Sequence, residues 1–170
     1  MIAQLVPVSA LAWFEWLFGL RAPAISPANP QDAASLASLH ATAFQRGWSA
    51  VEFERLLIEP NVVADRATAG PRLVGFVLSR LAADEAEILS IAVAPAYRRR
   101  GLARKLLDVH MRRLAGYGVT ALYLEVDERN APARRLYGGF GFAEVGRRQS
   151  YYAHDSREAG SALILRRELA

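Results

Sequence analysis

The sequence contains no cysteine, and only three of its 170 residues are histidine. The lack of cysteine excludes disulfides, thiolate metal ligands and a cysteine nucleophile, and makes a reducing cytoplasm the expected compartment. The histidines, His40, His110 and His154, are too widely spaced for a ligand pair, so we expect no metal site.

Lysine is nearly missing as well. Lys105 is the only one, so arginine supplies almost all of the positive charge behind the net charge of +4 and the pI of about 9.8. Such a basic surface is suited to bind nucleic acid, an acidic peptide or a phosphorylated cofactor. It is equally explained by a genome-wide bias toward arginine, without any binding role. Because no helix-turn-helix or similar signature accompanies the charge, we expect no nucleic-acid partner.

The chain also lacks a long uninterrupted apolar run. Residues 1–20 are strongly apolar, but Pro7 and Glu15 interrupt them and no basic residue precedes Arg21. A membrane span needs about 20 apolar residues in a row, and a signal peptide needs a positive start. We expect residues 1–21 to be an extension with a short helix docked on protein, rather than on a membrane surface, and residues 22–170 to form one domain.

The hydrophobic fraction of 52% is sufficient for a packed core. Hydrophobic periodicity and turn residues predict a mixed α/β domain with a central sheet. The first half is expected to contain a strand near Ile25, helices over 30–44 and after Ser49, and strands over 61–65, 72–81 and 86–93. The second half is expected to contain a helix over 101–115, a strand over 120–126, a helix from Asn130 to Gly138-Gly139, and strands over 142–145 and 162–166. Ser49 and Glu52 have the spacing of a capping box. The helix over 101–115 is expected to bury an apolar stripe of Leu102, Ala103, Leu106, Leu107, His110, Met111 and Leu114, with Arg104, Lys105, Asp108, Arg112 and Arg113 facing water. In the strand over 120–126, Glu125 is expected to share a face with Tyr123, opposite Leu122, Leu124 and Val126. The tight connection between the strands at 72–81 and 86–93 predicts that they pair antiparallel.

One segment combines a buried strand, an arginine loop and a helix that begins at a glycine: Ile91-Ala92-Val93-Ala94-Pro95-Ala96-Tyr97-Arg98-Arg99-Arg100-Gly101-Leu102-Ala103. The first turn of a helix presents unpaired N–H donors and a partial positive charge, which together bind phosphate. Gly101 removes a side chain from the point of closest approach, and Ala103 keeps the next turn open. The loop also fits an ordinary helix start with solvated arginines.

This segment resembles the acyl-CoA-binding motif Q/R-x-x-G-x-G/A of the GNAT acetyltransferase superfamily, with Arg98, Gly101 and Ala103 at the motif positions. The resemblance covers roughly residues 22–168 and implies a mostly antiparallel sheet flanked by helices, in which a splayed strand pair holds acetyl-CoA. The residues that it implies for this co-substrate are Ile91, Ala92, Val93, Arg98, Arg99, Arg100, Gly101, Leu102, Ala103 and Arg104. It also implies that residues 22–170 are the acetyltransferase domain.

Within the superfamily the chain is most similar to the RimI type, the ribosomal-protein-alanine N-acetyltransferases. The supporting pieces are Ala43-Phe44, Trp48-Ser49, Ile91-Ala92-Val93, Leu124-Glu125-Val126, Asn130, Leu136-Tyr137, Gly139-Phe140-Gly141-Phe142 and Tyr151-Tyr152. The resemblance implies a protein acceptor, namely the N-terminal α-amine of an alanine-starting ribosomal protein of the small subunit.

Acetyl transfer from a thioester to an amine needs a base for the ammonium group and an acid for the leaving thiolate. Glu125 is the only charge in the strand TALYLEV, and apolar neighbours help a carboxylate to accept a proton. An exposed glutamate near a strand end fits the same pattern, and Tyr137 fits an ordinary core aromatic. The RimI resemblance implies that Glu125 is the base and Tyr137 the acid, in a direct attack without an acyl-enzyme.

Asn130 precedes Pro132 as a helix N-cap would, and the resemblance implies that it also hydrogen-bonds the pantetheine arm. On the acceptor side, the resemblance implies that Phe44 and Trp48 form one wall of a peptide groove, and that Tyr151 and Tyr152 line the other. A basic surface loop with two packed tyrosines is an equal interpretation of the segment from Arg147 onward.

Several departures from the family pattern leave the acceptor open. Gly138-Gly139 replaces a typical Glu-Ser, Ser161 stands near a position that is usually acidic, and residues 1–20 lie outside the pattern. The alternatives are acetylation of a small-molecule amine or a lysine side chain, and a non-catalytic module that binds acetyl-CoA.

Overall fold

The computed structural model describes residues 22–148 and 161–169. The extension expected over residues 1–21 and the predicted site residues Tyr151 and Tyr152 lie outside the described residues. The helices are α2 (Ala33–Ala41), α3 (Ala50–Ile58), α4 (Leu102–Gly116) and α5 (Ala131–Gly138), with short 3-10 helices over Pro30–Asp32 and Pro95–Tyr97. The strands are β1 (Ala24–Pro27), β2 (Val62–Ala69), β3 (Arg72–Ala82), β4 (Glu85–Val93), β5 (Ala121–Asp127), β6 (Ala143–Arg148) and β7 (Ala162–Glu168).

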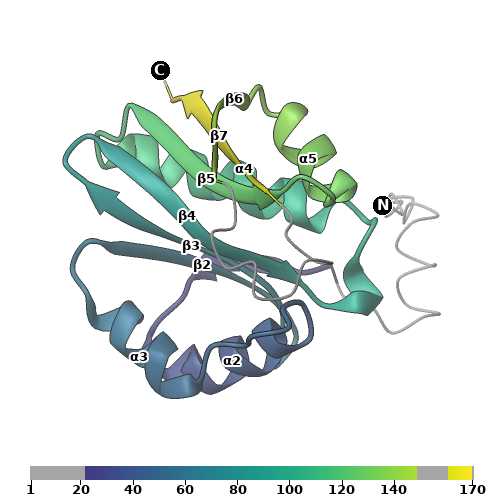
Figure 1. Cartoon of the computed structure of the whole chain (residues 1–170). Helices are drawn as coiled ribbons and strands as arrows, with labels where there is room; N and C mark the ends of the chain where they lie inside the picture. The colour runs from purple at the N-terminus through teal and green to yellow at the C-terminus, as the bar shows by residue number, and fades with distance from the viewer. Residues whose placement is uncertain (1–21, 149–160, 170) are drawn as a thin grey trace, which may run out of the picture.

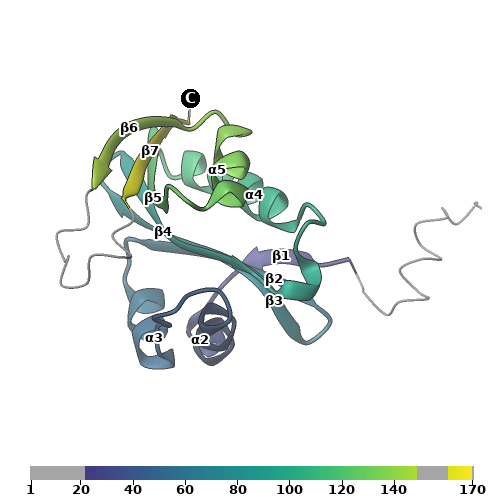
Figure 2. The ribbon, with the colours of Figure 1, turned by 45° about the vertical axis from the view of Figure 1, so that its right-hand side comes forward.

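The strands form one sheet in the order β1-β2-β3-β4-β5-β7-β6. Every neighbouring pair is antiparallel except β4 and β5, which run parallel because helix α4 crosses over between them. Helices α2 and α3 cover one face of the sheet, and α4 and α5 cover the other (Figure 1, Figure 2). The predicted mixed α/β fold with a mostly antiparallel sheet is confirmed. In the described part of the chain, no helix is both long and apolar enough to cross a membrane.

Two strands are longer than the sequence pattern predicts. The strand expected over 61–65 continues to Ala69, because it pairs with both β1 and β3. The strand expected over 142–145 continues to Arg148, where it pairs with Ala162 of β7. Arg147 and Arg148 therefore lie on a strand and not in the predicted loop, since a long-range partner extends the ladder.

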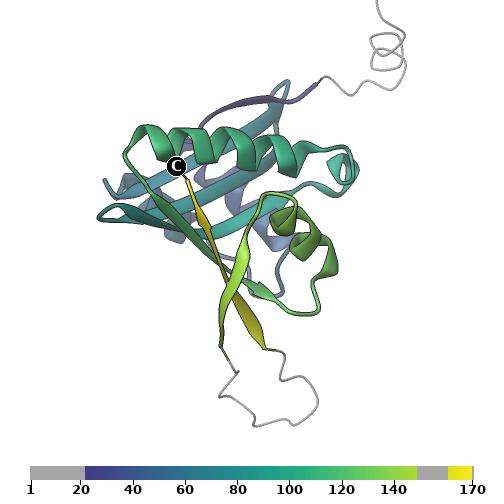
Figure 3. The same ribbon diagram turned by 90° about the horizontal axis from the view of Figure 1, so that it is seen from above.

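Helix α4 lies along the sheet (Figure 3). Its predicted apolar stripe is buried at Leu102, Leu106, Leu107, His110, Met111 and Leu114. Leu106, Leu107 and Leu114 are fully buried in this layer. An added Cβ on Gly75 of β3 would lie 2.8 Å from Cδ1 of Leu106, so glycine lets the helix approach the strand closely. The depth of this packing helps to set the position of the loop at the start of α4.

A buried chain of polar groups joins α4 to β2 and β3. Nδ1 of His110 lies 2.8 Å from Oδ2 of Asp65, and its Nε2 lies 2.8 Å from Oγ of Ser79. Nη2 of Arg113 lies 2.8 Å from Oδ1 of the same aspartate, so the prediction that Arg113 simply faces water is wrong. A buried carboxylate requires such partners. Because Ser79 is closed to solvent, this Ser-His-Asp arrangement holds α4 in place and is not open to a substrate.

The other helical layer begins at the predicted capping box, which is confirmed. Oγ of Ser49 accepts a hydrogen bond from the N–H of Glu52, and the Glu52 carboxylate accepts one from the N–H of Ser49. The helix that follows buries Phe53 edge-on against Phe76 of β3. These contacts fix the start of α3 and the loop that holds Trp48.

Candidate active site

Strands β4 and β5 separate part-way along their length. Their pairing ends at Ile88 and Leu124, although β4 continues to Val93. At the same point Leu89 is an extra residue in the β3–β4 ladder, which makes a β-bulge. A bulge bends its strand, and the bend accompanies the opening between β4 and β5. The predicted splayed strand pair is present.

Beyond the split, Ile91, Ala92 and Val93 pair with β3 on one edge and have no β5 partner on the other. This free backbone edge is what the predicted contact with the acetyl-pantetheine arm requires. The carbonyl oxygen of Val93 accepts a hydrogen bond from Nε of Arg98 at 2.9 Å. Oγ of Ser90 is buried beside the split without a hydrogen-bond partner among the described residues.

The arginine loop turns sharply just before α4. Arg99 and Gly101 have positive φ angles of 57° and 79°, and glycine adopts this left-handed conformation without strain. A Cβ on Gly101 would meet nothing within 4 Å, so the space in front of the helix is open. Lys105 donates to the carbonyl of Gly101 at 3.0 Å, and the amides before Lys105 belong to the unpaired first turn of the helix. Left-handed residues beside a helix N-terminus make a concave set of N–H donors, which fits the pyrophosphate of acetyl-CoA.

Arg104 connects the first turn of α4 to the end of α5. Its guanidinium carbon lies 4.9 Å from the ring centroid of Phe140, and its Nη1 would lie 3.3 Å from a Cβ on Gly139. The side chain of Arg104 is thus held against Phe140 and Gly139. The second glycine of the Gly138-Gly139 pair leaves room for this guanidinium.

Tyr137 is buried, with 5% of its surface exposed, in a cluster that includes Val93 and Leu102. Its ring packs edge-to-face on Phe142 at a centroid distance of 5.7 Å. Burial raises the pKa of Tyr137 to about 12, so the phenol stays protonated at neutral pH. A general acid must begin in this protonated form.

A tight turn between β5 and α5 positions that tyrosine. Oδ1 of Asp127 accepts hydrogen bonds from the backbone N–H of Arg129 at 2.8 Å and from its Nε at 3.1 Å, and these bonds lower the pKa of Asp127 to about 2. Oδ1 of Asn130 accepts from the N–H of Ala133 at 3.1 Å, which confirms the predicted N-cap. The turn fixes the start of α5, and Tyr137 lies in its last turn.

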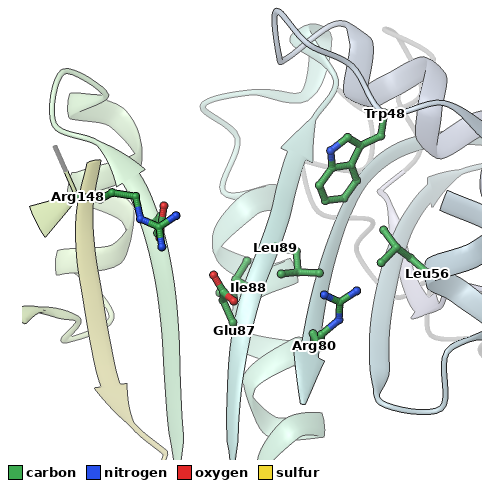
Figure 4. A pocket seen from close by; sticks show the side chains of 8 residues that line it. Trp48, Leu56, Arg80, Glu87, Ile88, Leu89 and Arg148 are labelled. Carbon is green, nitrogen blue, oxygen red and sulfur yellow. The ribbon is translucent and has the colours of Figure 1, made fainter. Parts of the chain in front are cut away.

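A cavity of about 490 Å³ opens on the α2–α3 side of the split. It is lined by Trp48, Leu56, Arg80, Glu87, Ile88, Leu89, Glu125 and Arg148. Figure 4 shows Arg148 on one side of the opening, with Trp48, Leu56 and Arg80 beyond β4 on the other side. The cavity therefore combines an apolar wall with two carboxylates and two guanidinium groups. Nowhere in residues 22–148 and 161–169 do three histidine or carboxylate side chains come together as a metal site would require.

Glu125 lies in this cavity, but its predicted apolar surroundings are wrong. Its side chain is 33% exposed, and its Oε1 lies 3.0 Å from Nη2 of Arg148. The prediction that it shares a strand face with Tyr123 is consistent with the burial of Leu124 and Val126 on the opposite face. The apolar residues next to Glu125 in sequence face the core, so they do not surround its carboxylate.

The two residues predicted for the acceptor wall are separated by His40, which sequence reasoning did not select. Trp48 lines the cavity, and its backbone N–H donates to Nδ1 of His40 at 3.1 Å. Burial lowers the pKa of His40, which favours the neutral ring that can accept this bond. Phe44 stacks on the same imidazole at 4.2 Å, is 40% exposed and does not line the cavity. The helix predicted over 30–44 ends at Ala41, so Phe44 lies beyond it.

The split sheet thus has the loop predicted to bind phosphate toward α4 and a charged cavity toward α2 and α3. The sequence profile of the Acetyltransferase (GNAT) family matches residues 33–142, which is more than half of the chain. The chain belongs to the GNAT acetyltransferase family. This GNAT protein is therefore an acyltransferase, and the acyl donor of the family is acetyl-CoA.

Relatives of this GNAT protein include the ribosomal protein bS18-alanine N-acetyltransferase of Salmonella typhimurium, with 41% identity over 87 residues. That match spans 51% of the chain and 59% of the relative. The crystal structure of the ribosomal-protein-S18-alanine N-acetyltransferase from Escherichia coli superposes with a TM-score of 0.80 and 30% identity, and covers 88% of this chain and 95% of that one. Arabidopsis thaliana NAA60 in complex with acetyl-CoA has the same fold, with a TM-score of 0.74, 22% identity and coverage of 86% and 98%.

Proposed function

We propose that this protein transfers the acetyl group of acetyl-CoA to the N-terminal α-amine of a ribosomal protein that starts with alanine. The observation that carries the proposal is the split between β4 and β5, because it connects a phosphate-binding loop on one face with a charged cavity on the other. A thioester held in the split is reachable by an amine from the cavity side. We infer the acceptor from the relatives, which are ribosomal protein bS18-alanine N-acetyltransferases. A ribosomal acceptor implies that the reaction takes place in the cytoplasm.

In the proposed reaction Glu125 accepts a proton from the acceptor ammonium, directly or through water. The neutral amine attacks the thioester carbonyl carbon, an N–C bond forms, the C–S bond breaks, and the attacking nitrogen releases its second proton to solvent. Tyr137 donates its phenolic proton to the leaving thiolate and regains one from solvent. The two groups lie toward opposite faces of the split sheet, with Glu125 lining the cavity and Tyr137 buried beside Leu102 of α4. This separation supports direct transfer between two substrates that enter from opposite sides.

Roles for the remaining predicted residues follow from the same arrangement. The backbone from Arg98 to Arg104 would hold the pyrophosphate, and the free edge of β4 would hold the pantetheine arm. Asn130 caps α5 with its side-chain oxygen, so its amide nitrogen remains the group that would reach the arm. Trp48 would form the apolar wall against the acceptor.

The test is mass spectrometry of synthetic peptides after incubation with acetyl-CoA. Peptides that start with alanine should gain one acetyl group at the α-amine, whereas the same peptides with a blocked N-terminus and an internal lysine should not. Tyr137→Phe should lower kcat by about 10²–10⁴-fold and leave the KM for acetyl-CoA within about two-fold, because a general acid acts in the transition state. Glu125→Gln should lower kcat within the same range.

Other outcomes distinguish the remaining candidates. Acetylation of polyamines, aminoglycosides or lysine side chains, but not of alanine-starting peptides, would replace the proposed acceptor and retain the acetyltransferase. Binding of acetyl-CoA without turnover on any amine would indicate a non-catalytic module. Unchanged turnover in Tyr137→Phe would remove that residue from the acid role.

A further inference from the structure

The side chain of Arg148 reaches across one strand to meet Glu125. In the sheet, β7 lies between β5 and β6, and Glu125 stands opposite Ile164 of β7. Nη2 of Arg148 lies 3.0 Å from Oε1 of Glu125, and both residues line the cavity. The pair is therefore created by the order of the strands, because nothing in the local sequence brings residues 125 and 148 together.

The other charges of the cavity come from β3 and β4. Arg80 of β3 pairs with Glu59 at 3.1 Å, outside the cavity lining. Glu87 of β4 has no ion-pair partner within residues 22–148 and 161–169. Of the two lining carboxylates, only Glu125 is thus held by a cation in this part of the chain. The selective pairing points to a role for Arg148 at the carboxylate that the proposed reaction uses.

We propose that Arg148 is a positioning residue for Glu125. It holds Oε1 from the β6 side, which leaves Oε2 as the oxygen that faces an incoming amine. Arg148 is 70% exposed, so its ion pair is weakly held and can adjust when a cationic amine enters. This inference rests on the proposed role of Glu125.

Arg147 provides a matched control on the same strand. Its guanidinium pairs with Glu144 at 2.7 Å and with Glu128 at 3.5 Å, and it does not line the cavity. Arg147→Gln removes the same charge from a neighbouring exposed position without touching Glu125. Because both arginines are exposed, neither change is expected to affect folding, which thermal unfolding would verify.

The experiment is a double-mutant cycle in steady-state kinetics with an acceptor peptide and acetyl-CoA. Arg148→Gln should lower kcat by about ten-fold with an unchanged KM for acetyl-CoA, since a proton acceptor that is less well placed affects the chemical step. In a Glu125→Gln background, Arg148→Gln should lower kcat by less than about two-fold, because the two residues act as one unit. Arg148→Lys should recover part of the loss by restoring the charge without the planar fork. Arg147→Gln should match the wild type.

The possible failures are separable. If the wild type acetylates no alanine-starting peptide, the proposed acceptor is wrong, and the cycle applies to whichever amine the enzyme does acetylate. If Glu125→Gln is as active as the wild type, both the base and the role of Arg148 are wrong. Two outcomes would overturn the positioning role alone. In the first, Glu125→Gln is impaired while Arg148→Gln has the same kcat as Arg147→Gln. In the second, Arg148→Gln lowers kcat equally in the wild type and in Glu125→Gln.

Discussion

Nε of Arg98 donates a hydrogen bond to the carbonyl oxygen of Val93 at 2.9 Å. This bond joins the first residue of the phosphate-binding loop to the last residue of β4. It therefore couples two parts of the proposed acetyl-CoA site, the loop that faces the pyrophosphate and the strand edge that faces the pantetheine arm. The first position of the family motif thus has a structural reason, because a long donor is needed to reach back to the strand.

Removing this bond should weaken the binding of acetyl-CoA. Arg98→Ala leaves the loop without its link to Val93, and the loss of one hydrogen bond from a charged donor corresponds to about a ten-fold rise in the KM for acetyl-CoA. Arg112→Ala is the control, because Arg112 is an exposed α4 arginine that pairs with Asp108. Steady-state kinetics and calorimetric titration with CoA would measure the effect. An equal rise in both variants would indicate loss of general charge instead of loss of the link.

A comparison of two glycines tests the phosphate loop. Gly101 and Gly118 flank α4, both have positive φ angles, and an added Cβ meets nothing at either position. Gly101→Ala and Gly118→Ala should therefore lower the free energy of unfolding by similar amounts, about 1–2 kcal/mol, because a residue with a side chain is strained in the left-handed conformation. Only Gly101→Ala should also raise the KM for acetyl-CoA, because its methyl group faces the pyrophosphate. Urea unfolding and kinetics measure the two effects, and equal KM values in the two variants would contradict the assignment.

The burial of Tyr137 predicts an alkaline loss of stability. Tyrosine in an unfolded chain ionises near pH 10, whereas the pKa of Tyr137 in the folded protein is about 12. Between these values the unfolded chain binds fewer protons than the folded protein, so the free energy of unfolding falls as pH rises. Below pH 10 the ionisation of Tyr137 does not lower the free energy of unfolding. Between pH 10 and pH 12 it should lower this free energy by on the order of 3 kcal/mol.

Urea unfolding between pH 8 and 12 would measure this loss in the wild type and in Tyr137→Phe. The Phe variant lacks the ionising hydroxyl, so its stability should fall less steeply above pH 10. Tyr117→Phe is the control, because Tyr117 is 62% exposed in the folded protein. Curves for the wild type and Tyr137→Phe that remain parallel would show that the phenol is not buried.

Glu87 should attract the cationic acceptor into the cavity. Glu87→Gln removes a lining carboxylate and should raise the KM for an acceptor peptide roughly two- to five-fold, the range expected for an exposed charge pair. Glu85 lies two residues earlier on the same face of β4, contacts the Tyr123 hydroxyl at 3.2 Å and does not line the cavity, so Glu85→Gln is the matched control. The effect should shrink in high salt. A change in kcat alone would point to a different role.

The buried polar chain should carry much of the attachment of α4 to the sheet. Asp65→Asn removes a buried charge that contacts both His110 and Arg113, and should cost about 3–5 kcal/mol of unfolding free energy. Asp108→Asn removes an exposed partner on the same helix and should cost less than about 0.5 kcal/mol. Denaturant unfolding separates the two. A loss below 1 kcal/mol in Asp65→Asn would show that the network is not structurally important.

Local signals were enough for several elements of the fold. The capping box at Ser49, the N-cap at Asn130 and the apolar stripe of α4 all depend on residues three or four positions apart, and all three predictions are confirmed. The phosphate-binding loop has the same origin, because strand, arginines, glycine and helix are consecutive. Such features could be predicted because their partners lie within one or two turns of the chain.

The surroundings of Glu125 could not be predicted in this way. Its sequence neighbours are apolar, but alternation along a strand directs them into the core, and the contacts of the carboxylate come from β6 across β7. The split between β4 and β5 coincides with one bulged residue, Leu89, which no composition or periodicity marks. The pairing of Arg113 with Asp65 likewise joins a helix to a strand far away in sequence.

The sequence therefore determined the arginine loop at the start of α4, since a contiguous loop at a helix N-terminus carries its own geometry. The sequence also selected Trp48 and Glu125, but only the tertiary structure brought them together with Arg80, Glu87 and Arg148, where strands β3 to β6, α3 and the loop before it meet around one cavity. Charged residues that meet only through strand order and long-range packing have no characteristic separation in the sequence, so no sequence pattern predicts their contacts.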